Sequence, residues 1–199
     1  IQAAAQLGLS KVNTFIGRDW QKSLEANWPL VQEVWPGIIA EAKKAGVRIG
    51  IENCPMLFGK DEWPGGKNLA VSPAVWRQLF REFPDGTLGL NFDPSHLLWL
   101  GIDPVAALKP YVDRVAHAHA KDAETFPAER NRYGFFGRTS TRAEDPWDMG
   151  WWRYRIPGLG QVDFRGYVDT LYEGGFDGVL SVEHEDPVWG GSPERVEAG

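Results

Sequence analysis

The chain has 199 residues, of which 43% are hydrophobic and 24% are charged, and its formal net charge is -6. This composition is typical of a folded globular protein, and the negative charge argues against a nucleic-acid partner, because affinity for phosphates depends on clustered Lys and Arg. Because no apolar stretch reaches membrane-spanning length and the single cysteine, Cys54, cannot form an internal disulfide, we expect a cytoplasmic protein without a membrane partner.

Strand-like and helix-like segments alternate along the chain. The predicted strands are Val12 to Ile16, Val47 to Ile51, Thr87 to Phe92, Arg114 to Ala118 and Gly178 to Val182. Strict alternation of strands and helices indicates βαβ units and a parallel sheet, so residues 1–199 are expected to form a single α/β domain.

The segments between these strands carry helix signals. Leu30 to Ala45 is predicted to be a helix that Pro36 kinks or shortens. Its apolar stripe is predicted to consist of Leu30, Val34, Ile38 and Ala42. Three later helices are expected to begin after the N-cap residues Ser72, Asp103 and Asp163, two of which precede a proline. A long loop is expected from Ala120 to Val162.

The residues at the strand ends decide between a barrel and an open sheet. Leu88, Leu90 and Phe92 alternate with small or polar residues, and the strands near Ile51 and Val182 show the same pattern. In a parallel barrel the apolar set faces the helices and the other set points inward, toward the active-site end. No Gly-rich phosphate-binding pattern, which would favour a doubly wound sheet, occurs. The sequence therefore favours a (β/α)8 TIM barrel.

Four successive predicted strands end in an acidic or histidine residue. These residues are Glu52, Asp93, His119 and Glu183. A single acidic residue at a strand end is usually solvated or paired with a lysine, but four in succession favour a shared ligand set at the mouth of the barrel. Three carboxylates and one imidazole suit one divalent metal ion, with Mn²⁺ preferred and Mg²⁺, Co²⁺, Fe²⁺ or Zn²⁺ tolerated.

The same residues lie in motifs that resemble those of a known family. The motifs are Glu52-Asn-Cys-Pro, Asp93-Pro-Ser-His96, His119-Ala-Lys121-Asp122 and Glu183-His-Glu-Asp186. From about Val47 to Asp186 the chain resembles the xylose isomerase-like TIM barrel family of sugar phosphate isomerases and epimerases. The resemblance implies that the four strand-end residues bind the metal, that His96 contacts the substrate, and that Glu52 and Glu183 act as acid and base.

The implied function is a divalent-metal-dependent isomerase or epimerase that converts a sugar, a sugar phosphate or a keto-sugar through an enediolate stabilised by the metal. A lyase or dehydratase acting on a keto-sugar or keto-glycoside is the alternative, because removal of a proton next to a carbonyl can also lead to elimination. A nuclease of the endonuclease IV kind is disfavoured by the negative charge and by the total of four histidines. An inactive binding module and a homo-oligomer are left open.

Two further expectations concern the substrate pocket. Lys121 is predicted either to bind substrate or to pair with nearby acids, and it stands close to where the family's epimerases commonly carry an arginine. Tryptophans near the active-site end are predicted to pack against a sugar: Trp63, Trp99, Trp147, Trp151 and Trp152.

The family's strand count also predicts which part of the barrel the chain covers. If the strand before Glu183 is the eighth, the chain contains strands four to eight and begins in the third helix, at Ile1 to Leu7. Because such barrels typically have about 250 residues, we expect an N-terminally truncated fragment.

Overall fold

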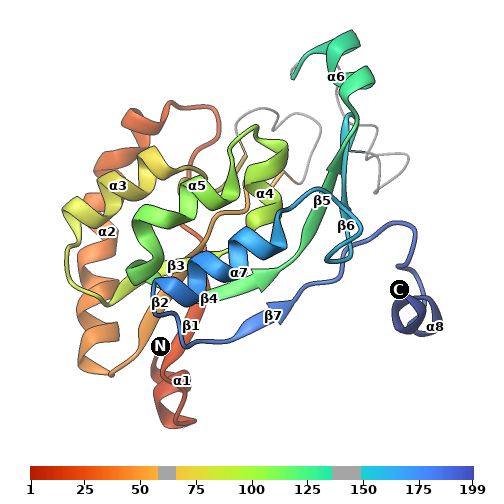
Figure 1. The fold of residues 1–199 in the computed structure, drawn as a ribbon. Helices are drawn as coiled ribbons and strands as arrows, with labels where there is room; N and C mark the ends of the chain where they lie inside the picture. Colours follow the sequence, from red (N-terminus) through yellow and green to blue (C-terminus); the bar gives the residue numbers. More distant parts are fainter. Residues whose placement is uncertain (58–65, 136–148) are drawn as a thin grey trace.

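The computed structural model describes residues 1–57, 66–135 and 149–199. Five parallel strands form one curled sheet in the order β1-β2-β3-β4-β7, which is half of a TIM-barrel-like fold (Figure 1). The strands are β1 (Lys11–Thr14), β2 (Arg48–Glu52), β3 (Leu88–Phe92), β4 (Val115–Ala120) and β7 (Leu180–Val182). All five predicted strands are confirmed to within a few residues. Their assignment to barrel strands four to eight stays a prediction.

The register of the sheet brings the strand ends together. Ile49 pairs with Leu88, Glu52 with Asn91, and Asn91 with His117. On the last pair of strands, His119 is opposite Ser181. Because parallel strands end at the same edge of a sheet, residues that close β2, β3, β4 and β7 lie near one another.

Helices cover one face of this sheet. They are α2 (Leu24–Lys44), α3 (Pro73–Glu82), α5 (Pro104–Leu108) and α7 (Phe164–Glu173), with the 3₁₀ helix η2 (Lys109–Arg114) and the short α4 (Pro94–Trp99) between them (Figure 1). The Asp103 side chain accepts hydrogen bonds from two backbone N–H groups of α5, and Asp163 accepts one from Gly166 in α7. These two predicted caps are confirmed. Ser72 precedes α3 but makes no capping bond with its side chain.

The main hydrophobic core lies between the sheet and these helices. Ile49, Ile51, Leu88, Leu90 and Phe92 are buried there against the tryptophans and tyrosines of the helices. The predicted alternation is therefore confirmed for β2 and β3, whose apolar residues face the helices, but not for β7, where Leu180 and Val182 are 39% and 70% exposed. Polar side chains are left for the other face of the sheet. In the described ranges, no helix is long and apolar enough to cross a membrane.

Helix α2 differs from its prediction. It begins earlier, at Leu24 behind the N-cap Ser23, and continues through both Pro29 and Pro36. Leu30 and Val34 are 56% and 44% exposed. The buried stripe consists instead of Trp28, Val31, Trp35, Ile39 and Ala42. The prediction was wrong for Leu30 and Val34, because burial of two large indole side chains removes more apolar area from water than burial of a leucine and a valine. It was right for Ala42, which is buried, and Ile38 packs partly buried against the core.

The predicted long loop contains a second sheet. Strands β5 (Asp122–Thr125) and β6 (Trp152–Arg155) pair antiparallel, with α6 (Pro127–Tyr133) between them, and they project beyond the carboxyl end of β4 (Figure 1). The stacked rings of Trp99 and Trp152, 4.4 Å apart, join this hairpin to α4. The loop prediction was wrong here, since two segments far apart in sequence pair with each other. Trp63 and Trp147 lie outside the described residues.

The chain's ends also carry short helices. They are α1 (Gln2–Gln6) and α8 (Pro193–Ala198). A helix was expected at Ile1 to Leu7 and is found at Gln2–Gln6. Its identity as the third helix of a barrel stays a prediction.

Candidate metal centre

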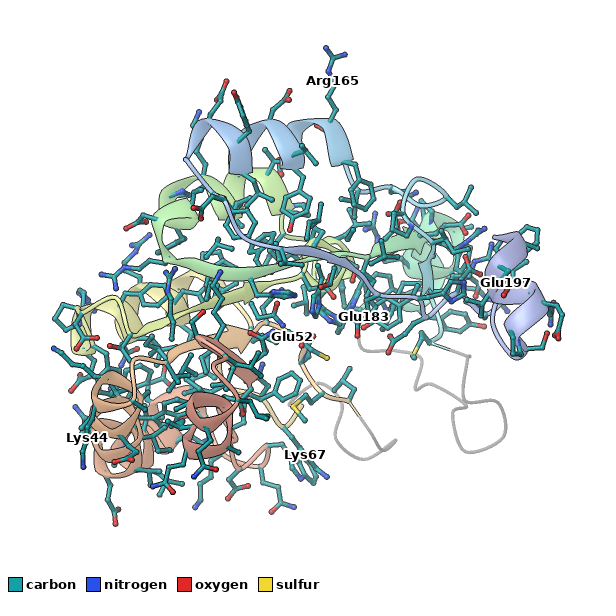
Figure 2. The ribbon with its side chains drawn as sticks, turned by 90° about the horizontal axis from the view of Figure 1, so that it is seen from below. Lys44, Glu52, Lys67, Arg165, Glu183 and Glu197 are labelled. Carbon is teal, nitrogen blue, oxygen red and sulfur yellow. The ribbon has the colours of Figure 1, made fainter. Side chains whose placement is uncertain are left out.

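The four strand-end residues meet at one point. Glu52 is the last residue of β2, Asp93 follows β3 directly, His119 lies in β4, and Glu183 follows β7. One ligand atom from each of the four lies within 4.8 Å of the others. Figure 2 shows Glu52 and Glu183 close together near the centre of the molecule. The folded chain therefore assembles the set that the sequence predicted as ligands.

The atoms of this set fit a divalent cation. His119 Nδ1 lies 3.0 Å from Glu183 Oε2 and 3.7 Å from Asp93 Oδ2. All three atoms are buried, and none makes a hydrogen bond of acceptable geometry with a described residue. Buried polar atoms without partners are costly, and a cation between them would satisfy all three at once. Three carboxylates and one imidazole are hard to borderline donors, which suits a divalent ion of the Mg²⁺ to Zn²⁺ range.

Neighbouring amides hold this set in place. Asn53 joins β2 to β3, because its side chain donates to the Asp93 carbonyl and accepts from the Asp93 N–H, both at 2.8 Å. Asp93 Oδ1 accepts from the N–H and the hydroxyl of Ser95, which leaves Oδ2 facing the site. The Asn91 amide nitrogen lies 3.3 Å from both Glu52 Oε2 and His119 Nε2. These supporting amides were not identified from the sequence.

His96 is buried beside the acidic residues. Its Nε2 atom lies 3.1 Å from Asp93 Oδ2 and 3.4 Å from Glu52 Oε1, and its Nδ1 atom lies 2.8 Å from the Tyr154 hydroxyl. Burial alone would lower the pKa of His96, but the charge of Asp93 outweighs it and raises the pKa well above its usual value. Tyr154 was missed, although the alternating Trp-Arg-Tyr-Arg run of β6 is a strand signal.

Lys121 is also buried, and it pairs with acids. Its Nζ atom lies 2.6 Å from Glu185 Oε2, 3.4 Å from Glu183 Oε2 and 4.1 Å from the centre of the Tyr154 ring. Burial alone would lower the pKa of Lys121, but the surrounding groups that can carry negative charge raise it above its usual value. Of the two predicted roles, pairing is the one seen in the structure. Contact with substrate stays a prediction.

His117 lies two residues before His119 on the same strand. Its Nε2 atom is 2.9 Å from the Ser181 hydroxyl, and its ring meets that of His119 edge to face. The described residues therefore tie His117 to β7, deeper in the sheet than the four candidate ligands.

A cavity of about 390 Å³ opens beside this set. Its polar wall contains Glu52, His96, Lys121, Glu183 and Glu185. Its apolar wall contains Phe15, Met56, Leu57, Trp99, Met149 and Trp152. This volume and mixture are typical of small-molecule sites. Of the predicted tryptophans, Trp99 and Trp152 line the cavity, while Trp151 packs against Trp99 and Phe135.

A family model described as "xylose isomerase-like TIM barrel" matches residues 1–199. The uncharacterized protein YfiH of Bacillus subtilis (strain 168) is 30% identical over 156 residues, which are 76% of this chain and 45% of that protein. The inosose dehydratase of Lacticaseibacillus casei is 28% identical over 126 residues, which are 61% of this chain and 39% of that enzyme. The chain thus spans less than half the length of these relatives.

Several solved structures share the fold. Mannonate dehydratase from Streptococcus suis serotype 2 has a TM-score of 0.70 and 12% identity, covering 97% of this chain and 62% of its own. The IolI protein with a bound zinc atom has a TM-score of 0.65 and 19% identity, covering 94% and 58%. L-ribulose 3-epimerase has a TM-score of 0.63 and 16% identity, covering 94% and 52%. At these identities the likeness shows the fold alone.

Proposed function

Because the chain belongs to the xylose isomerase-like TIM barrel family, as its motifs predicted, we propose that it isomerises or epimerises a small sugar. The reaction would move a proton next to a carbonyl group. The observation that supports this most is the meeting of Glu52, Asp93, His119 and Glu183 within 4.8 Å beside a cavity of small-molecule size. Whether this chain carries the whole activity is part of the proposal, since it spans only part of its relatives.

In this proposal Glu52, Asp93, His119 and Glu183 hold one divalent ion. When bound, the ion supplies positive charge that stabilises the negative charge developing on the substrate's oxygens. The oxygen-rich set suits Mn²⁺ or Mg²⁺. The zinc bound to IolI, which shares the fold, supports a site that also accepts other divalent ions.

Glu52 and Glu183 are the proposed proton carriers. They come from β2 and β7, which β3 and β4 separate in the sheet, so each can approach the substrate from a different side. Removal of a proton on one face and return on the other inverts the carbon, and return to the neighbouring carbon gives isomerisation. Lys121 does not fit the role of base, because the surrounding acids raise its pKa and keep it protonated.

Dehydration is the second candidate. Curated relatives of the chain include inosose dehydratases, and loss of water requires a group that donates a proton to the departing hydroxyl. His96 can supply that proton, since Asp93 raises its pKa and the imidazole lines the cavity. Both outcomes start from the same removal of a proton next to a carbonyl.

One experiment separates the candidates. The metal-loaded chain is incubated with keto-sugars and inososes in D₂O, and the products are followed by NMR. An isomerase or epimerase would give a sugar of unchanged composition with deuterium at the altered carbon, whereas a dehydratase would give an unsaturated ketone. Metal binding without any product from the panel would favour the inactive binding module.

A further inference from the structure

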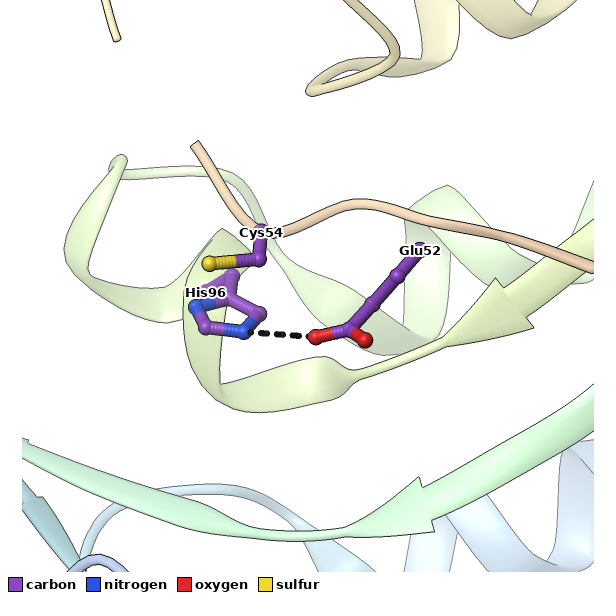
Figure 3. Close-up of side chains that lie close together, drawn as sticks. All are labelled: Glu52, Cys54 and His96. Carbon is purple, nitrogen blue, oxygen red and sulfur yellow. Dashed lines mark ion pairs between the residues drawn. The ribbon is translucent and has the colours of Figure 1, made fainter. Parts of the chain in front are cut away.

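Cys54 is part of a second group of candidate ligands beside the first. Glu52, Cys54 and His96 each place one ligand atom within 4.8 Å of the other two (Figure 3). Glu52 is the last residue of β2, and Cys54 follows it by two residues. His96 reaches them from α4. All three residues line the cavity.

The spacing in this group suits a tetrahedral metal ion. Ligands bound at about 2.0 to 2.3 Å in tetrahedral geometry lie about 3.3 to 3.8 Å apart. The one separation drawn in Figure 3, from His96 Nε2 to Glu52 Oε1, is 3.4 Å. Cys, His and Glu are all residue types that bind zinc, and catalytic zinc sites have three protein ligands with the fourth position left open.

His96 is oriented as a ligand. The residue is 1% exposed, and its Nε2 atom is buried without a hydrogen bond of acceptable geometry to any described residue. Its other ring nitrogen lies 2.8 Å from the Tyr154 hydroxyl. Metal-binding histidines usually use their second nitrogen in such a hydrogen bond, which sets the ring orientation and the tautomer. Nε2 faces Asp93 Oδ2 at 3.1 Å and Glu52 Oε1 at 3.4 Å, so a metal bound here would displace the proton that this nitrogen shares with the two carboxylates.

We propose that Glu52, Cys54 and His96 form a second divalent-metal site for a zinc-like ion that accepts a thiolate ligand. The two sites share Glu52, since Oε1 faces His96 while Oε2 accepts a hydrogen bond from Asn91. A shared carboxylate places two ions about 3.5 to 4 Å apart in known two-metal sites. The two sites should differ in metal preference, because the Cys54 thiolate is a softer donor than a carboxylate and favours zinc or cobalt over magnesium.

The single cysteine makes the site testable without knowledge of the substrate. Cys54 is the only thiol in the chain, so a thiol reagent reports on this site alone. Metal-free protein is titrated with Co²⁺ while thiolate-to-cobalt charge-transfer absorption is followed, and with Zn²⁺ while the reaction of Cys54 with the reagent is followed. We expect two equivalents of metal, appearance of the charge-transfer band, and loss of thiol reactivity upon binding.

Two variants identify the site. Cys54→Ser should remove the band and one equivalent of metal, with the fold checked by circular dichroism. His119→Ala, which changes a residue of the first set only, should lose the other equivalent and keep both the band and the protection of Cys54. This result would hold whether or not the protein acts on a sugar.

Three results would overturn the proposal. In the first, Cys54 reacts equally fast with and without metal and no charge-transfer band appears. The metal would then fail to displace the proton on His96, and no second ion would bind. Cys54→Ser could bind as many equivalents as the unchanged chain. The band could vanish in His119→Ala, which would assign the thiol to the first ion and leave no second site.

Discussion

The ammonium group of Lys121 lies 2.6 Å from the Glu185 carboxylate at the polar wall of the cavity. With only 2% of its surface exposed, Lys121 brings a buried positive charge close to Glu183 as well. Water screens a buried charge less than an exposed one, so its electrostatic interactions are stronger. Lys121 can therefore stabilise negative charge on a substrate bound in the cavity.

Replacement of Lys121 by Met should therefore impair turnover. We expect kcat to fall by about a hundredfold or more, since loss of one group that stabilises developing charge typically costs this much. Lys44→Met, at an exposed position at the end of α2, is the matched control and should leave kcat unchanged. Steady-state kinetics on the substrate found in the NMR screen measures both. A Lys121→Met enzyme with normal kcat would restrict this residue to a structural role.

Removal of a first-set ligand should weaken metal binding. Asp93→Ala and His119→Ala should each lower the affinity by about a hundredfold or more, because even groups that only support ligands contribute about 10- to 100-fold. Asp163→Ala is the control, since it removes an exposed capping carboxylate outside the site and should leave the metal affinity unchanged. Elemental analysis and calorimetric titration would report the change. Wild-type affinity in both variants would refute the assignment.

Metal affinity should depend on pH through His119. Burial alone would lower the pKa of this imidazole, but Asp93 and Glu183 outweigh that effect and raise it to about 9. In the absence of metal, His119 is therefore protonated below that pH, and a metal must displace the proton. Affinity should fall about tenfold per pH unit below the pKa and level off above it. Calorimetry in buffers of different ionisation enthalpy measures the released proton, and an affinity that stays constant at lower pH would contradict this.

The two glutamates should matter more for turnover than for binding. Glu52→Gln and Glu183→Gln keep a ligand oxygen but cannot accept the proton, so most activity should be lost, by about 10² to 10⁴-fold, while part of the metal affinity remains. For the unchanged protein in D₂O, deuterium should appear at the altered carbon. Near-normal rates in both variants, together with a product free of solvent deuterium, would refute the two-glutamate mechanism. This conclusion requires a separate test that the removed proton does not return to the substrate without exchanging with solvent.

Asp122 should be important for stability although it does not contact the site. Its buried carboxylate accepts hydrogen bonds from the N–H groups of Ala123, Gly158, Gly160 and Val162. A Cβ atom at Gly160 would collide with this carboxylate, so the turn needs glycine there. Asp122→Ala leaves these donors without their acceptor and should lower the free energy of unfolding by about 3 kcal/mol.

Asp163→Ala is the matched control for Asp122→Ala. It removes one exposed capping bond and should cost about 1 kcal/mol. Denaturant unfolding compares the two variants. Equal losses would show that water replaces the Asp122 carboxylate in the turn.

The sequence by itself determined the order of the parallel strands and the candidate ligands. Alternation of Leu88, Leu90 and Phe92 with polar residues is local information, because it follows from the two-residue period of a strand. The caps at Asp103 and Asp163 are local in the same way. Once parallel strands are assumed, their ends must meet, so the convergence of Glu52, Asp93, His119 and Glu183 could be predicted without coordinates.

Only the tertiary structure decided which further groups reach that point. Tyr154 meets His96 because β6 pairs with β5 across a long separation in sequence and packs on α4. Cys54 and His96 come together because the segment after β2 lies beside α4. Such contacts depend on how elements distant in sequence pack, and no local periodicity encodes them. Packing also chose the buried stripe of α2, since the indole rings of Trp28 and Trp35 bury more apolar surface than Leu30 and Val34 would.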